Sequence, residues 1–186
     1  MKGSKVSHSR IVPVLIVIVL ASGAAMAQEP NYNLIDAGWW NFNPDGSSSE
    51  DGWFLGGGFE LKSNKARFHL GAEIGQLGSS TTWEIGGGWH GLLGKRADLV
   101  ANGSWVDLDV EDGFEVSIGV RWMLLRRLEL NGFLNYANLD FSNTASAEIN
   151  GIWDFARRWG VGGGYLQGDD RARARAFVRF NFGKRE

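Results

Sequence analysis

The chain has 186 residues, a formal net charge of −2 at pH 7 and no cysteine. Without cysteine it cannot form disulfides, cysteine-ligated zinc or iron–sulfur centres, or a thiol nucleophile. A mildly acidic chain also lacks the basic stripe with which proteins displace counterions from nucleic acid, so we expect no nucleic-acid partner.

The first 27 residues have the three parts of a cleavable secretory signal. Lys2, Lys5 and Arg10 form a basic start, residues 11–20 form an apolar core, and residues 25–27 (Ala-Met-Ala) offer a small-residue cleavage site. The apolar core is too short for a membrane-spanning helix, which needs roughly 20 residues. We therefore expect export, cleavage after Ala27, and one folded domain over residues 28–186.

A repeat organises the rest of the chain. Basic residues recur at intervals of 31 positions, and an apolar residue follows each of them three positions later: Lys65, Arg96, Arg127 and Arg158, then Phe68, Leu99, Leu130 and Val161. A fixed period indicates a repeated supersecondary unit. The unit is too short for two spanning helices but fits two strands with two connections, so we predict four repeated hairpins.

Alternation of apolar and polar residues predicts strands in this repeat. In chain order, the alternating segments are 31–42, 52–62, 66–77, 82–93, 97–107, 114–123, 128–137, 145–155, 159–167 and 172–182, which makes ten strands. The first alternates poorly around residues 34–36, where we expect a β-bulge.

Two patterns indicate that the apolar face of these strands meets lipid. Aromatic residues gather near the strand ends, in one group (Trp53, Trp83, Trp105, Phe114, Tyr136, Tyr165) and a second group (Trp89, Trp122, Trp153, Trp159, Phe182), as in the interfacial girdles of membrane barrels. The connections alternate between tight basic turns at 63–66, 94–96, 125–127 and 156–158 and acidic loops, expected to be longer, at 43–51, 78–81, 107–113, 140–144 and 168–171. Unpaired strand edges are costly in hydrocarbon, so the sheet must close. The predicted fold is all-β: a closed antiparallel up-and-down transmembrane β-barrel of ten strands.

The leader, the paired strands and the closing stretch 172–182, with alternating Ala176, Val178 and Phe180, resemble the small outer-membrane barrels of the outer-membrane protein X, outer-membrane protein A and opacity-protein type. The resemblance covers the whole mature chain. It implies a monomer in the outer membrane of a Gram-negative cell envelope, in contact with membrane lipid and lipopolysaccharide and inserted by the barrel-assembly machinery. Members of this group usually have eight strands, so eight is the alternative count.

The face expected to point into the lumen is densely charged. It comprises Glu60, Lys62, Arg67, Glu73, Glu84, Asp98, Glu115, Arg121, Glu129, Glu148, Asp154, Arg173, Arg175 and Arg179, together with His69 and His90. Charges in a confined space must pair or stay hydrated. They predict either a salt-bridge network that fills a narrow barrel or a small hydrated passage.

The pattern does not favour catalysis or a metal site. A hydroxyl nucleophile needs a base within hydrogen-bond reach, and neither His69 nor His90 has Ser or Thr two residues away. The acidic run 107–112 offers oxygen ligands but lacks the spacing of an EF-hand loop. We expect no enzyme, no cofactor and no defined metal site.

Two functions remain open at the level of sequence. One is a passive or structural role in the envelope, with a narrow pore as its specific form. The alternative is surface recognition or adhesion through the acidic loops. A longest loop of only about nine residues, 43–51, counts against the second.

Overall fold

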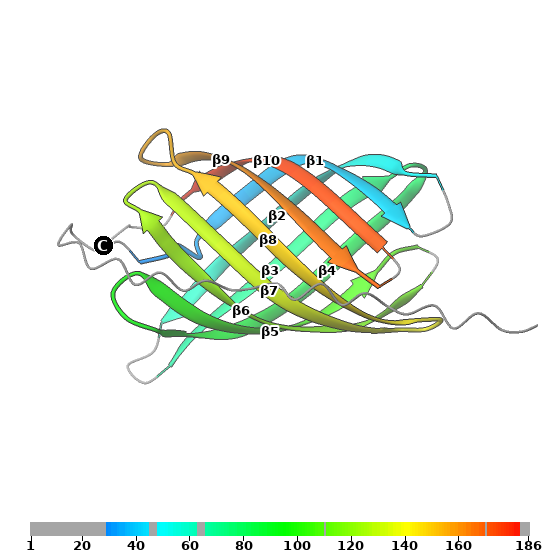
Figure 1. Ribbon diagram of the computed structural model, residues 1–186, viewed down its shortest axis with the longest axis horizontal. Coiled ribbons are helices and arrows are strands. Elements are labelled where there is room, and N and C mark those ends of the chain that lie inside the picture. The colour runs from blue at the N-terminus through cyan, green and yellow to red at the C-terminus, as the bar shows by residue number, and fades with distance from the viewer. Residues whose placement is uncertain (1–28, 45–47, 63–65, 110, 170, 183–186) are drawn as a thin grey trace, which may run out of the picture.

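The computed structural model describes residues 29–44, 48–62, 66–109, 111–169 and 171–182, which form one closed β-barrel (Figure 1). The predicted leader and its cleavage site at Ala27 lie outside these residues. The described residues contain no helix long and apolar enough to cross a membrane.

The strands follow one another in chain order, and each pairs antiparallel with its neighbours. They are β1 (Leu34–Pro44), β2 (Glu50–Lys62), β3 (Arg67–Leu77), β4 (Ser80–Leu92), β5 (Ala97–Asp107), β6 (Asp112–Leu125), β7 (Leu128–Leu139), β8 (Asn143–Trp153), β9 (Trp159–Gly168) and β10 (Arg171–Asn181). Pairing of β1 with β10, from Leu34 opposite Asn181 to Pro44 opposite Arg171, closes the sheet. The predicted ten-stranded barrel is confirmed, and the alternative of eight strands is wrong.

The alternation in the sequence is what directs side chains to the two sides of the barrel wall. On β7, Glu129, Asn131 and Asn135 are buried on the lumen side. Leu134 and Tyr136, on the opposite face of the strand, are 59% and 50% exposed. Polar residues therefore point inward and apolar residues outward, the reverse of a soluble barrel with an apolar core.

The outer surface is apolar and carries the expected aromatic residues. Trp53, Trp105 and Tyr165 of the first group are half exposed, as are Trp153 and Trp159 of the second. Soluble monomers rarely expose an apolar surface of this extent, whereas a transmembrane barrel requires one. The fold is a transmembrane β-barrel with its apolar side toward lipid.

Two details of the sequence prediction are wrong. The connections at the acidic end have two to five residues, and so do those at the basic end, because the strands run further than alternation indicated. The pairing of β1 is continuous from Leu34 to Pro44, and the register shift lies instead in β6, between Met123 and Leu125.

The two ends of the barrel are named by their connections. The acidic-loop end has the connections 45–49, 78–79, 108–111, 140–142 and 169–170. The basic-turn end has the connections 63–66, 93–96, 126–127 and 154–158.

Candidate functional site in the barrel lumen

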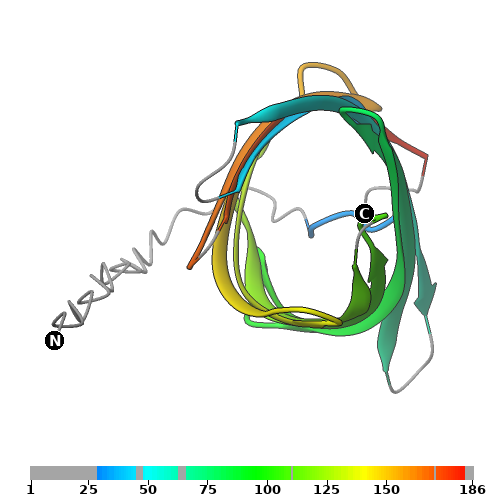
Figure 2. The ribbon, with the colours of Figure 1, turned by 90° about the vertical axis from the view of Figure 1, so that its right-hand side faces the viewer.

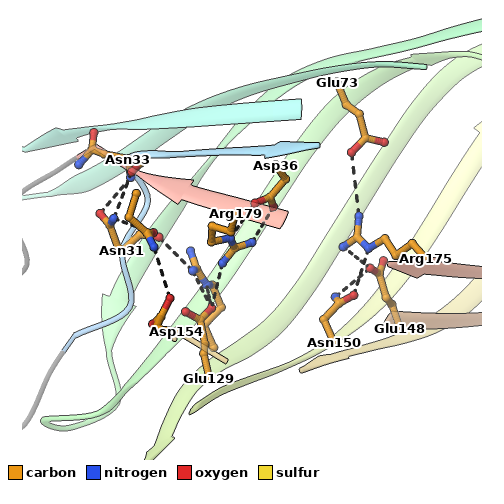
Figure 3. Close-up of polar contacts among 12 residues, drawn as sticks. Asn31, Asn33, Asp36, Glu73, Glu129, Glu148, Asn150, Asp154, Arg175 and Arg179 are labelled. Atoms are coloured by element: carbon orange, nitrogen blue, oxygen red, sulfur yellow. Dashed lines mark hydrogen bonds and ion pairs between the residues drawn. The ribbon is translucent and has the colours of Figure 1, made fainter. Parts of the chain in front are cut away.

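The predicted luminal charges gather in two groups separated along the barrel (Figure 3). One group lies toward the basic-turn end and comprises Glu60, Arg67, Asp98, Arg121, Glu129, Asp154 and Arg179; the other lies toward the acidic-loop end and comprises Glu73, Glu84, Glu115, Glu148, Arg173 and Arg175. The side chain of Lys62 lies outside the described part of the structure.

The centre of the basic-turn group, around Arg121, Glu129 and Arg179, is buried and closely paired. Nε and Nη2 of Arg121 donate to Oε1 of Glu129 over 2.9 and 2.6 Å. Arg179 donates to both carboxylate oxygens of Asp36, at 2.8 and 2.7 Å, and its Nη1 lies 3.9 Å from Glu129. The side chains of Arg121, Glu129 and Arg179 are all less than 10% exposed. Buried charges with such bidentate partners are typical of a structural network.

His90 and Asp98 are fully buried beside this network. Nδ1 of His90 lies 3.2 Å from Oδ2 of Asp98. Its Nε2 lies 3.3 Å from Oε1 of Glu60, a distance that permits ion pairing but lacks hydrogen-bond geometry. The ring is thus held between two carboxylates, on β5 and β2.

The acidic-loop group is more open. Arg175 donates to Glu148 over 2.7 Å and to Asn150 over 3.2 Å. The remaining pairs are longer: Arg173 to Glu148 and Arg171 to Glu115, each at 3.8 Å, and Arg175 to Glu73 at 4.0 Å. These side chains keep between 12% and 25% of their surface exposed.

A cavity of about 290 Å³ joins the two groups. Its wall includes Glu73, Glu84 and Glu115, the amide and hydroxyl side chains of β5 to β8, and glycines of β2 to β5. Glu73 and Glu84 lie directly opposite each other in the pairing of β3 with β4. Among the described residues, Glu84 makes no hydrogen bond or ion pair. This part of the wall therefore carries negative charge that nearby arginines offset only at long range.

Sequence reasoning missed an apolar cluster inside the lumen. Trp40, Phe54, Ile152 and Phe177 pack together and are at most 6% exposed. A Cβ at Gly162 would lie 2.5 Å from Cζ of Phe177, so glycine there makes room for the ring. The alternation in β10 could have predicted the inward position of Phe177. This residue lies midway between Arg175 and Arg179, so its side chain must point to the same side of the sheet as theirs.

The most consequential feature absent from the sequence prediction is the segment before β1. Residues 31–33, expected to begin the first strand, lie before β1 and, with residues 29 and 30, extend from the barrel wall into the lumen in Figure 2. The phenol of Tyr32, 4% exposed, donates to Asp98 over 3.0 Å. Its ring stacks on His90 at 3.8 Å between centroids, and the Arg121 guanidinium lies 4.3 Å from the ring centre. The position of Tyr32 in the lumen could not be predicted, because a single tyrosine before a strand is not part of any periodic pattern.

The described residues contain no group of three or more His, Asp or Glu side chains arranged to hold a metal ion. The buried His90 has a carboxylate on either side but no hydroxyl among its hydrogen-bond partners.

Comparison with protein-family models finds no match, and neither does comparison with curated proteins. Membership of the outer-membrane protein X, protein A or opacity group therefore stays a prediction.

Solved structures do match. A KdgM porin in complex with disordered oligogalacturonate has a TM-score of 0.56 at 10% identity, with 81% of this chain and 99% of that chain covered. Another structure of KdgM porin gives 0.51 at 12% identity, with coverage of 81% and 99%. A NanC porin gives 0.53 at 5% identity, with coverage of 80% and 100%. At such identities the likeness is one of fold.

A closed barrel with a polar lumen, a lipid-facing apolar exterior and aromatic residues at both interfaces is the architecture of outer-membrane barrels. The chain is an integral outer-membrane β-barrel. Its fold is similar to that of the KdgM and NanC porins.

Proposed function

We propose that this barrel is a narrow, passive pore for small hydrophilic solutes and ions. The observation that carries the proposal is the cavity of about 290 Å³, whose wall of half-buried charges and amides lies between the dry network and the acidic-loop end. A purely structural lumen would be filled by paired or apolar side chains, as it is around Arg121 and around Phe177. In this proposal, the salt-bridge network fills the basic-turn part of the lumen, and the hydrated passage lies toward the acidic-loop end.

The charge of the wall suggests which solutes it favours. In the described lumen, carboxylates outnumber guanidinium groups: Asp36, Glu60, Glu73, Glu84, Asp98, Glu115, Glu129, Glu148 and Asp154 against Arg67, Arg121, Arg171, Arg173, Arg175 and Arg179. A confined wall of one sign concentrates ions of the other. One KdgM structure is described with oligogalacturonate, a polyanion. Here the arginines are matched by carboxylates, which favours small cations and neutral polar solutes instead.

Surface recognition through the acidic loops gains no support. The connections at that end have two to five residues, and the structural neighbours are porins. Such short connections offer a partner little surface, since specific interfaces bury about 800 Å² on each side.

Conductance of refolded protein in planar bilayers tests the pore. We expect small discrete current steps and a reversal potential in a salt gradient that indicates cation preference. Glu84→Gln should reduce that preference without lowering the conductance to background, because it removes one wall charge that has no close cationic partner. Glu50→Gln, at the rim of the barrel, is the matched control and should change selectivity less. Residues 29–33 enter the lumen, so a variant with these residues replaced by Gly and Ser is measured as well. If both the wild type and this variant give only the current of bare lipid, the proposal is wrong.

A further inference from the structure

The segment Glu29–Asn33 lies inside the barrel without being part of the sheet. The ladder of β1 begins at Leu34, which pairs with Asn181 on one side and Gly58 on the other. The five residues before it are therefore held by side-chain contacts and a few backbone hydrogen bonds, and not by strand pairing.

These contacts reach the wall on several sides. Nη2 of Arg67 on β3 donates to Glu29 over 2.8 Å. Nη2 of Arg121 on β6 donates to the carbonyl of Asn31 over 3.0 Å. The Asn31 amide donates to Asn181 of β10 over 3.0 Å. The segment is therefore attached to strands far apart around the barrel, and Figure 2 shows it extending into the lumen.

Tyr32 occupies a site built for it. Asp98 accepts a hydrogen bond from the Tyr32 hydroxyl, and the guanidinium of Arg121 lies over the Tyr32 ring. The rings of His90 and His69 lie 3.8 and 4.9 Å from the Tyr32 ring, between centroids. Asp98 and His90 are fully buried, so removal of the phenol would take one hydrogen bond from a buried carboxylate unless water replaced it.

The same residue is a wall of the cavity. Tyr32 and Arg121 both line it, so the segment forms part of the cavity wall on the side of the basic-turn mouth. The ladders of β1 from Leu34 onward can stay intact when the segment leaves, although the backbone hydrogen bonds that Phe182 and Glu60 donate to Asn33 must break. Its departure would open the cavity toward that mouth.

We propose that Glu29–Asn33 is a removable plug that closes the basic-turn mouth of the pore, with Tyr32 as its anchor. The inference rests on the proposed pore function. The slot on His90, Asp98 and Arg121 is a recognition site for this peptide, so the peptide also binds when supplied as a separate molecule.

The test compares full-length variants in planar bilayers. Tyr32→Ala, and a second variant with residues 29–33 replaced by Gly and Ser, should spend at least several-fold more time in the conducting state than the wild type. Tyr165→Ala is the matched control, because this tyrosine is 48% exposed on the lipid face. A synthetic peptide with the sequence of residues 29–33 should block the replaced variant when added on the basic-turn side only, and a peptide with Ala for Tyr should not.

The outcomes separate the two proposals. If the wild type and the replaced variant conduct equally and the peptide does not block, the plug is wrong and the pore stands. If neither the wild type nor the replaced variant conducts, both the pore and the plug proposals are wrong, because removal of the segment then opens no passage. Should Tyr32→Ala fail to fold, the replaced variant and its block by peptide decide the question by themselves.

Discussion

Two arginines on the same strand occupy different surroundings. Both line the cavity, but Arg179 is 9% exposed and holds Asp36 in a bidentate pair, whereas Arg175 is 22% exposed. Loss of one member of a dry pair leaves a poorly solvated charge, while a wetted partner can be hydrated in place. The same chemical change should therefore have different consequences four residues apart.

We expect Arg179→Gln to lower the free energy of unfolding by about 3–5 kcal/mol, because Asp36 loses its bidentate partner. Arg175→Gln should cost about 1 kcal/mol or less, as a partly solvated pair does, and should shift ion preference further toward cations. Denaturant unfolding in detergent measures the first effect, and the reversal potential in a salt gradient measures the second. Equal destabilisation by the two changes would mean that the lumen is uniformly dry.

At the scale of single strands, alternation predicted which residues form strands and which face each side chain takes. The 31-residue repeat placed the four basic turns, because turn chemistry and strand length recur together. What alternation missed was how far each strand continues past its last clear apolar–polar pair: β6 runs to Leu125 and β1 to Pro44. Rim residues face water on both sides, so polarity there no longer distinguishes in from out.

The inside–outside assignment of β6 can be tested with one residue from each face. Val120 is 37% exposed on the outer face near mid-strand, and Ser117 lines the cavity. Val120→Arg should cost roughly 2–4 kcal/mol, the range for a basic residue at the bilayer midplane. Ser117→Arg should be milder, because it enters a hydrated space beside carboxylates. Reversible folding into lipid vesicles measures both, and equal tolerance would reverse the assignment.

At the scale of the whole molecule, closure followed from the cost of unpaired edges in lipid, and the strand count followed from the ten alternating segments. The arrangement of side chains in the lumen could not be predicted from the sequence. Which charges pair depends on which strands lie across from one another, as with Arg175 of β10 and Glu73 of β3. The position of Tyr32 depends on a slot assembled from β4, β5 and β6. Contacts of this kind join residues far apart in sequence and leave no local pattern.

The orientation of the barrel in the membrane now rests on charge, since the connections at the two ends are equally short. We expect the basic turns to face the periplasm and the acidic loops the cell exterior. The chain has no cysteine, so each introduced cysteine is the sole target of a membrane-impermeant thiol reagent. Ser48→Cys and Glu111→Cys should be labelled on intact cells, whereas Lys95→Cys and Arg126→Cys should be labelled only after the outer membrane is permeabilised. Labelling of the basic turns on intact cells would mean that the barrel has the opposite orientation. The peptide that blocks the pore at the basic-turn end would then act from outside the cell.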